Sequence, residues 1–376
     1  MRFGSQLEIN LSALEKNHQK IKAICKSNEM IFMVKADAYG HGLVPITQFS
    51  FHELKIKEFG VASLGEAMTL RAKLPRDQFE IYVFSDVNFR DERLIEVYAN
   101  QRLIPVISSI DNLKIFLSNS EFRHVPLCLK FNTGMNRLGI EMNELEDVVH
   151  HLKMNGRKSI DHLMTHLACA SLSIKKNKKN IEQFENFEEV KSSLKTSGIS
   201  ISKTSIANSG AIEQGAGLNE SHIRPGLMMY GPSSLIPSIK ETSLWTGELI
   251  STLKTRILRT RLIERGTPIG YGASACPGSG LVAIMALGYG DGFSTSNQGA
   301  ELKFRDKNYK VVGRVNMDMT QLLLEGGVLG DINVDDDFTV WSPESENFDE
   351  LCKRSKMIPY EVFTSLTTRI SKNYIQ

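Results

Sequence analysis

Residues 31–85 read IFMVKADAYGHGLVPITQFSFHELKIKEFGVASLGEAMTLRAKLPRDQFEIYVFS. Three apolar runs of strand length lie in this stretch: IFMVKA (31–36), FGVASL (59–64) and EIYVFS (80–85). Amphipathic segments of helical character occur here and elsewhere in the chain: Leu11–Lys26, Glu66–Lys73 and Met142–Met154. Strands that alternate with helices predict parallel pairing, because parallel strands need a crossover connection.

The alternation of strand and helix continues through the first two-thirds of the chain. Further apolar runs of strand length are LIPVIS (103–108), PLCLKF (126–131), HLMTHL (162–167), KTSIAN (203–208) and LMMYG (227–231). The total of about eight strands favours a closed (β/α)8 barrel over an open sheet. We therefore expect residues 1–241 to form a (β/α)8 TIM-type barrel.

The pattern changes after residue 241. Strand-length segments follow, with turn residues between them: LISTLKTRILRTRLI (249–263), GSGLVAIMALGYG (278–290), AELKFRDKNYKVVGRV (300–315) and INVDDDFTVWS (332–342). We expect residues 242–376 to form a mostly β C-terminal domain with a helix at Tyr360–Lys372. Residues 1–8 could pair with this β domain.

Charge and cysteine usage exclude several classes of protein. Among 376 residues, 45 Lys and Arg balance 43 Asp and Glu, which gives no support for a nucleic-acid or membrane-surface partner. The five cysteines form no CxxC pair, so neither a metal site nor a disulfide framework is indicated. The basic stretch 173–180 contains no aromatic residue and predicts a solvated loop or helix start. We expect a soluble cytoplasmic protein.

The segment MVKADAYGHG (33–42) carries the clearest chemical signal. Lys35 follows an apolar strand, so it should lie at the C-terminal end of that strand, where barrel active sites are built. Partial desolvation there disfavours the charged form of a lysine and makes its amine a nucleophile. Gly40 and Gly42 allow the backbone to approach a ligand closely.

This segment resembles the pyridoxal-phosphate attachment motif of alanine racemases, in which the lysine carries the cofactor. Segments similar to other signatures of that family follow in the family's order: KFNTGMNRLG (130–139), MTHLACA (164–170), ANSGA (207–211), IRPGLMMYG (223–231), GYGAS (270–274), LGYGDGF (287–293), VGRVNMDM (312–319) and PYEV (359–362). The resemblance implies an isomerase that interconverts L-alanine and D-alanine, supplies D-alanine for peptidoglycan, and works as a homodimer with shared active sites.

The resemblance assigns the two proton-transfer groups. Lys35 would hold pyridoxal 5'-phosphate and act at one face of the substrate α-carbon. Tyr271 resembles the acid/base of the opposite face, which the partner subunit contributes. Both side chains have ordinary pKa values of about 10, so each needs a lowered pKa for efficient proton transfer.

The resemblance also assigns the groups around the cofactor ring and its phosphate. Arg224 would face the pyridine nitrogen, and His166 resembles the residue that orients this arginine. A guanidinium can only donate hydrogen bonds, so the pyridine nitrogen would stay unprotonated and the ring would be a weak electron sink. The predicted phosphate contacts are Ser209, the backbone amides of Gly226 and Leu227, and the phenols of Tyr39 and Tyr360.

A further set resembles the family's substrate-binding residues. Arg137 would contact the substrate carboxylate, and Lys130 resembles a lysine that is often carbamylated and then pairs with this arginine. Met317 would offer its backbone N–H to the carboxylate, beside Asp318. Tyr289 would line the entrance from the partner chain.

Three positions differ from the family pattern. Asn132 and Ser171 stand where the family usually has aspartate, and Thr295 stands near a usual arginine. Ser171 and Thr295 belong to the substrate corridor of the family, and both are uncharged. We therefore expect a wider or less selective corridor.

Other functions remain open at this point. A racemase of broader range, for example one that accepts serine, differs only in its corridor. A decarboxylase on the same fold would place a carboxylate at the pyridine nitrogen, which Arg224 argues against. A cofactor carrier would need neither the β domain nor Tyr271. A degenerate racemase, kept as a binding or structural subunit, is disfavoured by the presence of Lys35, Tyr271 and Arg224.

Overall fold

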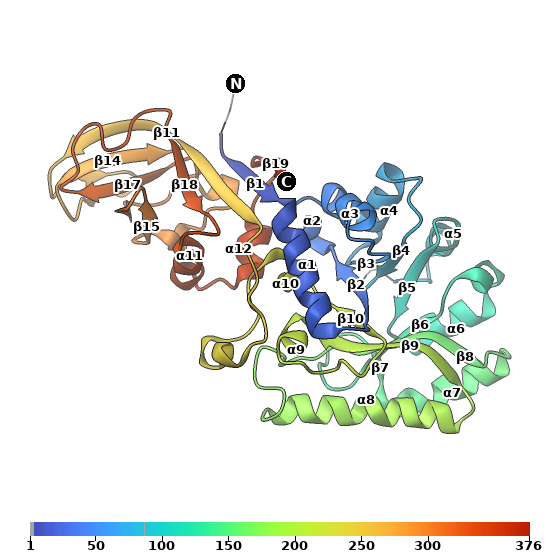
Figure 1. The fold of residues 1–376 in the computed structure, drawn as a ribbon. Coiled ribbons are helices and arrows are strands. Elements are labelled where there is room, and N and C mark those ends of the chain that lie inside the picture. The colour runs from blue at the N-terminus through green and yellow to red at the C-terminus, as the bar shows by residue number, and fades with distance from the viewer. Residues whose placement is uncertain (1–3, 86) are drawn as a thin grey trace. The chain divides into compact units, whose positions relative to one another are not determined.

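The computed structural model describes residues 4–85 and 87–376 and contains two compact units (Figure 1). The larger unit comprises Glu15–Ala38 and Leu43–Gly247. The other comprises the described part of Met1–Leu14, together with Tyr39–Gly42 and Glu248–Gln376. The predicted division at residue 241 stays a prediction.

The larger unit is a closed barrel. Within the described residues its eight strands are β2 (Glu29–Met33), β3 (Glu58–Val61), β4 (Glu80–Val83), β5 (Leu103–Ile107), β6 (Cys128–Asn132), β8 (Ser159–Met164), β9 (Ser200–Asn208) and β10 (His222–Arg224). Every neighbouring pair is parallel, and β10 pairs with β2 to close the ring. The predicted (β/α)8 barrel is confirmed. A short strand, β7 (Ile140–Glu141), pairs with β6 outside the ring.

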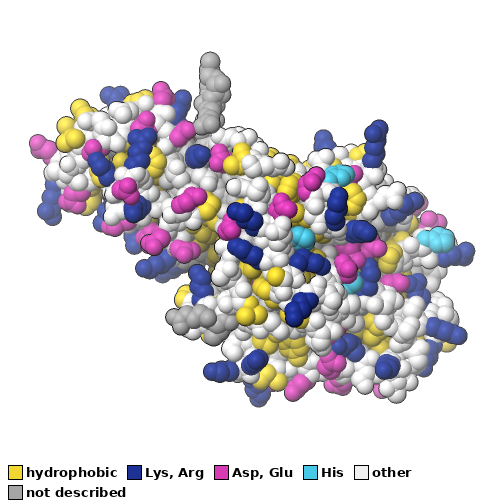
Figure 2. All heavy atoms as spheres, viewed as in Figure 1, with side chains coloured by type: hydrophobic (Ala, Val, Ile, Leu, Met, Phe, Trp, Pro, Cys, Tyr) yellow, Lys and Arg dark blue, Asp and Glu magenta, His cyan; other side chains and the backbone are white. Residues whose placement is uncertain are grey.

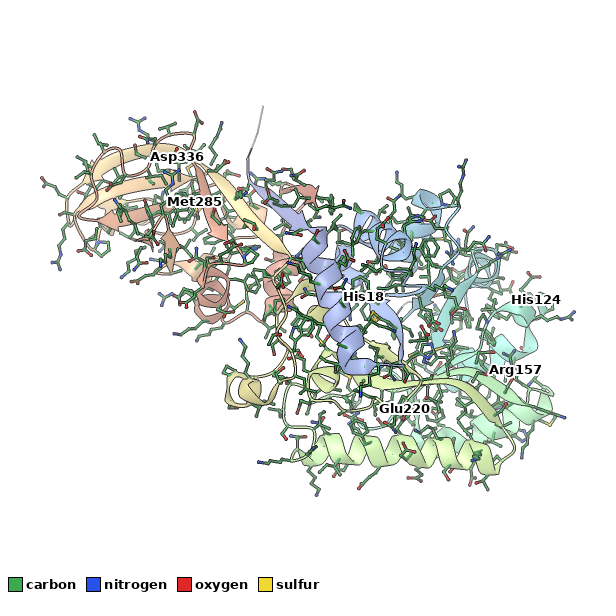
Figure 3. All side chains as sticks on the ribbon, in the orientation of Figure 1. His18, His124, Arg157, Glu220, Met285 and Asp336 are labelled. Carbon is green, nitrogen blue, oxygen red and sulfur yellow. The ribbon has the colours of Figure 1, made fainter. Side chains whose placement is uncertain are left out.

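The helices of this region alternate with the strands: α1 (Leu11–Cys25), α3 (Leu43–His52), α4 (Leu64–Lys73), α5 (Glu92–Asn100), α6 (Ile110–Ser118), α7 (Leu145–Met154), α8 (Lys178–Thr196), α9 (Ser209–Glu213) and α10 (Leu227–Tyr230). Helix α8 begins after Asn177, whose side chain accepts a hydrogen bond from the Asn180 N–H and caps the helix. Its Lys191 Nζ lies 2.6 Å from Glu220 Oε1, a residue labelled in Figure 3. The basic stretch is a loop and helix start, as predicted.

The predicted strand at 227–231 is wrong. Residues Leu227–Tyr230 form the buried helix α10, and the eighth barrel strand is His222–Arg224. A run of four apolar residues has no periodicity that distinguishes a buried helical turn from a buried strand. Gly226 lies between the strand and the helix, so the chain changes direction there.

The second unit is built on an eight-stranded mixed sheet. Its strands are β1 (Gln6–Asn10), β11 (Ser251–Ile263), β14 (Gly280–Met285), β15 (Glu301–Phe304), β16 (Lys307–Val312), β17 (Thr320–Glu325), β18 (Asp337–Trp341) and β19 (Ser371–Ile375). Strand β1 lies between β11, which is antiparallel to it, and β19, which is parallel. The expectation of a mostly β domain is confirmed. A two-residue ladder joins β12 (Pro268–Ile269) and β13 (Ser274–Ala275).

The predicted helix Tyr360–Lys372 is correct only in its first part. The structure has α11 (Asn347–Ser355) and α12 (Pro359–Ser365), and the chain then enters β19. Residues 371–375 pair with β1, whose residues lie at the opposite end of the chain. A local pattern does not reveal such a distant partner, and this explains the error.

On the face drawn in Figure 2, basic and acidic side chains are interspersed. None of the helices in the described part of the chain has the length and apolar character that a membrane crossing requires.

Candidate active site

Lys35 lies two residues beyond the end of β2, at the C-terminal end of the barrel strand, as the sequence predicts. The next element, α2 (Lys35–Tyr39), is a left-handed turn: Ala36, Asp37 and Ala38 have φ of 53°, 55° and 51°. Left-handed backbone costs about 1–2 kcal/mol per L-residue, so neighbouring groups must hold it.

Two carboxylates hold this turn. Glu66 Oε1 accepts a hydrogen bond of 2.6 Å from the Ala36 N–H, and Asp37 Oδ1 accepts one of 2.7 Å from the Leu43 N–H. Glu66 also closes the capping box of α4 with Ser63. The sequence analysis did not identify Glu66 as a site residue, although the Ser-x-x-Glu spacing at 63–66 was a visible signal.

Burial and neighbouring cations lower the pKa values of two lysines of the site. Burial lowers the pKa of Lys35, and the positive charge of Arg137 lowers it further, while Glu66 opposes the change. Burial, and then the charges of Arg137 and Arg224, lower the pKa of Lys130 to about 8. These amines are therefore better nucleophiles and bases than exposed lysines.

Arg224 is buried in the barrel, with 3% of its surface exposed. Its guanidinium donates hydrogen bonds to Ser205 Oγ and to the carbonyl oxygens of Thr165 and Ile206. Burial lowers the pKa of Arg224 to about 10, so it stays a cation and a donor at neutral pH. The sequence analysis missed Ser205 and Thr165.

His166 shares this electropositive environment. Burial, followed by the charges of Arg224 and Lys130, lowers its pKa well below the usual value, so the imidazole is neutral at physiological pH. Its predicted role of orienting Arg224 stays a prediction. Within the described residues, the polar partners of Arg224 are the Ser205 hydroxyl and the carbonyl oxygens of Thr165 and Ile206.

Ser209 begins α9 and is buried. Its Oγ lies 3.0 Å from the Gly226 nitrogen and 3.5 Å from the Met228 nitrogen, and both amides donate to it. Leu227, between them, is fully buried. A Cβ on Gly210 would lie 2.4 Å from the Ala170 carbonyl oxygen, so this close approach requires glycine. A hydroxyl and several amides thus lie together, which suits a phosphate.

Arg137 is carried by an exposed loop that Asn132 organises. Asn132 Oδ1 accepts hydrogen bonds from the Gly134 and Asn136 N–H groups. Its Nδ2 donates at 3.0 Å to Asn136 Oδ1 and to both carboxylate oxygens of Glu141. An aspartate at this position could not donate, and its charge would face that of Glu141. Asn132, which differs from the usual aspartate of the family, therefore has a matching local partner in Glu141.

We predict that Asn132→Asp destabilises this loop. The new carboxylate at position 132 would face the carboxylate of Glu141, and the hydrogen bonds that Asn132 Nδ2 donates would be lost. The free energy of unfolding should therefore fall by about 1–3 kcal/mol at pH 7. Urea unfolding at pH 7 and pH 4.5 measures the effect, which should shrink at the lower pH as a carboxylate becomes protonated. Asn136→Asp keeps the acceptor oxygen and is the matched control. Equal losses in both variants would contradict the prediction.

In the second unit, Tyr39 and Tyr360 lie together, with ring centroids 5.7 Å apart. Burial raises the pKa of Tyr39, so its phenol stays protonated and can donate. Gly40 has a φ of 77°, and a Cβ there would lie 2.2 Å from the Phe363 carbonyl oxygen. This close contact fixes the segment of Tyr39 against the helix that carries Tyr360.

Tyr289, Met317 and Asp318 lie on two turns that are bonded together. The Tyr289 and Gly290 amides donate to the carbonyl oxygens of Asn316 (2.9 Å) and Met317 (2.8 Å). Arg369 bridges the same turns, at 3.1 Å from an Asp291 oxygen and 2.9 Å from an Asp318 oxygen. The sequence analysis missed this arginine, which neutralises two carboxylates.

Tyr271 lies in the turn between β12 and β13, with 71% of its surface exposed. Tyr289 and Met317 are also exposed, at 46% and 52%. These are the residues that the resemblance assigns to an active site shared with a second subunit, and their exposure is compatible with that role.

The donors and charges of the barrel unit fit pyridoxal phosphate. Lys35 offers an amine of lowered pKa, Arg224 a buried donor, and the segments around Ser209 and Gly226 a hydroxyl and amides. Lys130 and Arg137 add positive charge, which favours an anionic ligand. The arrangement can attach a carbonyl compound covalently and hold a phosphate.

Comparisons with known proteins identify the family of the whole chain. Residues 9–234 match the family model "Alanine racemase, N-terminal domain", and residues 250–374 match "Alanine racemase, C-terminal domain". An alanine racemase of Thermodesulfovibrio yellowstonii is 33% identical over 388 residues, covering 98% of this chain and 97% of that protein. One of Rickettsia akari is 31% identical over 381 residues, covering 98% and 99%.

A solved structure shows the same fold. The alanine racemase of Bartonella henselae "with covalently bound pyridoxal phosphate" has a TM-score of 0.85 and 23% identity, and the match covers 100% of each chain. Both family models together span nearly the whole sequence. The chain therefore belongs to the alanine racemase family of isomerases.

Proposed function

We propose that this protein is a pyridoxal-phosphate-dependent alanine racemase that interconverts L-alanine and D-alanine. The supporting observation is Lys35, which follows a barrel strand, has a lowered pKa and shares its environment with the buried cation Arg224. Pyridoxal phosphate, when bound, supplies a conjugated ring that withdraws the electron pair left as the substrate loses its α-proton. The alanine racemases among the relatives support the choice of substrate.

Lys35 and Tyr271 are the two proton-transfer groups of this proposal. Lys35 holds the cofactor and takes or returns a proton at one face of the substrate α-carbon. Tyr271 does the same at the other face, from the partner subunit of a homodimer. The exposed ring of Tyr271 supports this assignment, since a side chain that serves a second subunit must project from its own.

Arg224 determines the type of chemistry. Because it only donates hydrogen bonds, it leaves the cofactor's pyridine nitrogen unprotonated and limits how much negative charge the ring accepts. A decarboxylase on the same fold would place a carboxylate there, so the buried Arg224 favours the racemase. The resemblance assigns the orientation of this cation to His166, whose imidazole is neutral.

The remaining cationic and hydrogen-bond-donating groups bind the phosphate and the substrate carboxylate. Ser209, the amides of Gly226 and Leu227, and the phenols of Tyr39 and Tyr360 hold the phosphate. The substrate carboxylate is bound by Arg137 and the Met317 N–H, with Asp318 adjacent and Tyr289 at the entrance. We further infer that the D-alanine serves peptidoglycan synthesis in the cytoplasm, which the resemblance alone supports.

If Lys130 is carbamylated, bicarbonate should raise the stability of the protein. The reason lies in the cost of burying this amine in its charged form. With a pKa of about 8, the folded protein disfavours the charged amine, whereas the unfolded chain has the ordinary value of 10.5. Below pH 8 the amine is charged in both states, so burying it lowers the free energy of unfolding by about 3 kcal/mol. This penalty fades as the pH rises from about 8 to 10.5.

Urea unfolding of wild type and Lys130→Met in CO2-free buffer measures this penalty. The variant should be the more stable protein at pH 7, and its advantage should shrink above pH 8. Bicarbonate should stabilise the wild type alone, because a carbamate converts the cation into an anion beside Arg137. A bicarbonate response in the Lys130→Met variant would count against carbamylation at this position.

The central experiment mixes the purified protein with pyridoxal phosphate and L-alanine and follows D-alanine with a D-specific oxidase. Formation of D-alanine supports the proposed function. If no D-alanine forms and carbon dioxide is released instead, the decarboxylase reading replaces it.

The neutral corridor positions Ser171 and Thr295 predict a broad substrate range. L-serine should be racemised at a rate within about tenfold of L-alanine, since a lost corridor charge weakens discrimination by about 1–2 kcal/mol. Ser171→Asp should narrow the range toward alanine. A wild-type rate for L-serine several hundredfold below that for L-alanine would contradict a wide corridor.

A further inference from the structure

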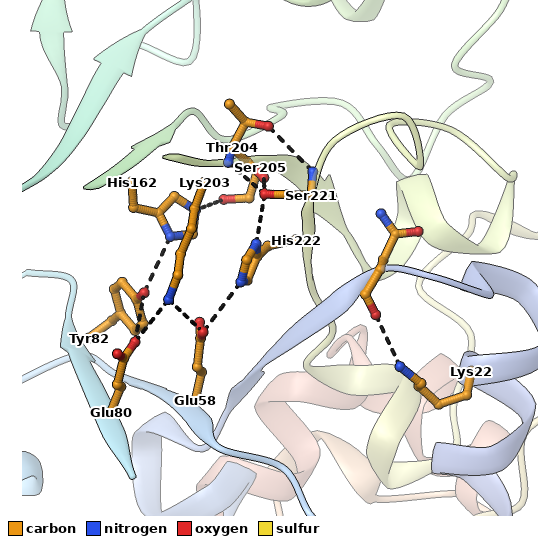
Figure 4. Close-up of polar contacts among 11 residues, drawn as sticks. Lys22, Glu58, Glu80, Tyr82, His162, Lys203, Thr204, Ser205, Ser221 and His222 are labelled. Atoms are coloured by element: carbon orange, nitrogen blue, oxygen red, sulfur yellow. Dashed lines mark hydrogen bonds and ion pairs between the residues drawn. The ribbon is translucent and has the colours of Figure 1, made fainter. Parts of the chain in front are cut away.

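A row of hydrogen-bonded polar side chains runs from Ser205 through His162 and Tyr82 to Glu80 (Figure 4). The Arg224 guanidinium donates to Ser205 Oγ, and Ser205 is fully buried. The same Oγ lies 2.8 Å from Nε2 of His162, which is 1% exposed. His162 is therefore connected to Arg224 through one hydroxyl group.

The row continues from His162 to the carboxylates at the N-terminal ends of the barrel strands. His162 Nδ1 lies 3.4 Å from the Tyr82 hydroxyl, which donates to Glu80 Oε2 at 3.3 Å. Lys203 Nζ then bridges Glu80 at 3.2 Å and Glu58 at 2.8 Å. The row thus links a buried cation to a pair of carboxylates.

The chemistry of the groups determines which atom donates and which accepts in each hydrogen bond of this row. Arg224 has donors only, so Ser205 Oγ accepts from it. Within the described residues, His162 Nε2 is the acceptor available to the Ser205 hydroxyl proton, and a buried hydroxyl without an acceptor is costly. His162 Nε2 is therefore unprotonated. Its Nδ1 carries the proton, and this N–H donates a hydrogen bond to the Tyr82 hydroxyl. The Tyr82 O–H in turn donates a hydrogen bond to Glu80.

The charges around His162 favour the same state. Burial, and then the charges of His222, Arg224 and Lys203, lower the pKa of His162 well below its usual value, so a second proton on the ring is disfavoured. Tyr82 contacts the ring edge-on, and burial raises the pKa of its phenol, so that group contributes no charge. Glu80 and Glu58 lie beyond Tyr82 and Lys203 and are partly neutralised by this lysine.

We propose that Ser205 and His162 are positioning residues for Arg224, with His162 locked as the neutral Nδ1–H tautomer so that the Ser205 oxygen faces the guanidinium. The proposal rests on the proposed function for what Arg224 then contacts, the pyridine nitrogen of the cofactor. Ser205 and the Thr165 carbonyl occupy two of the guanidinium donors and so determine where the others point. No sequence motif of the site includes His162, Ser205 or Tyr82.

Nitrogen-15 NMR of the full-length protein tests the tautomer directly, with and without pyridoxal phosphate. The His162 signals are identified by their loss in His162→Gln. From pH 6 to pH 9 we expect one protonated Nδ1 and one unprotonated Nε2, the reverse of the tautomer that free histidine favours. An Nε2–H tautomer, or a ring that gains a second proton in this range, would overturn the proposal. Ser205→Ala should release the constraint and shift the Nε2 signal.

Cofactor affinity of the apoprotein tests the positioning role. Loss of a hydrogen bond to a charged group is worth about 1.5–3 kcal/mol, so Ser205→Ala should bind pyridoxal phosphate at least about tenfold more weakly. Ser205→Thr keeps the hydroxyl and should recover most of the affinity. Ser200→Ala, an exposed position on the same strand β9, should bind like wild type.

The outcomes separate this inference from the proposed function. Unchanged affinity in Ser205→Ala, with the variant folded by circular dichroism, would overturn the positioning role. If the wild type bound no pyridoxal phosphate, the proposed function would fall. The tautomer measurement would still decide whether the row of hydrogen bonds has the stated direction.

Discussion

Lys35→Ala should abolish racemisation and covalent cofactor attachment together. In the proposed function Lys35 supplies both the amine that holds pyridoxal phosphate and one of the two proton-transfer groups, and loss of a general base alone costs about 10²–10⁴-fold. We therefore expect D-alanine formation to fall by at least about 10³-fold. Borohydride reduction followed by mass spectrometry should attach the cofactor to the wild-type chain at Lys35 and leave the variant unmodified.

Lys73→Ala is a matched control, since this exposed lysine ends α4 in the same unit. It should keep wild-type activity and labelling. Labelling of the Lys35→Ala variant at a different lysine, with activity retained, would show that Lys35 is not the attachment residue. If Lys73→Ala lost activity while its Lys35 still carried the cofactor, the loss would come from a defect unrelated to the Lys35 amine.

Tyr271→Phe should separate proton removal from racemisation. In the proposed function the phenol transfers a proton at one face only, so Lys35 should still exchange the α-proton of one enantiomer. We expect racemisation to fall by about 10²–10⁴-fold. Exchange of the α-proton with deuterium oxide, followed by proton NMR, should persist for one enantiomer and be lost for the other. Tyr289→Phe removes a phenol from another exposed ring and should have a much smaller effect.

Subunit mixing tests the origin of this tyrosine. We expect the Lys35→Ala and Tyr271→Phe proteins each to lack racemase activity. A mixed dimer has one site with both groups intact only if Tyr271 serves its partner. A statistical mixture should recover about a quarter of the wild-type activity, because half the dimers are mixed and each has one working site. No recovery in a mixture shown to contain mixed dimers would place Tyr271 in the site of its own chain.

The barrel could be predicted from the sequence because its strands are buried on both faces. Such strands appear as continuous apolar runs, as in IFMVKA and LIPVIS, and the residue that follows a run can be placed at the end of a strand. The position of Lys35 followed from that reasoning. The roles of the other site residues depended on family resemblance, because no local pattern distinguishes Tyr271 or Arg224 from ordinary packing residues.

The errors arose where distant segments decide the local structure. Residues 227–230 are buried on all sides, so their apolar run fits a helix as well as a strand. Residues 371–375 form a strand because β1 lies beside them, and β1 belongs to the other end of the sequence. In both cases the deciding neighbour is absent from the local sequence window.

The sequence by itself determined the alternation of strands and helices, the mostly β second domain and the chemical groups available for catalysis. Only the tertiary structure decided how those groups behave. Burial, and then the charges of Arg137 and Arg224, lower the pKa of Lys130 to about 8. Ser205 reaches both Arg224 and His162 because β8, β9 and β10 are neighbours. Charge and hydrogen-bond energies depend on distance and burial, and these quantities exist only once the chain has folded.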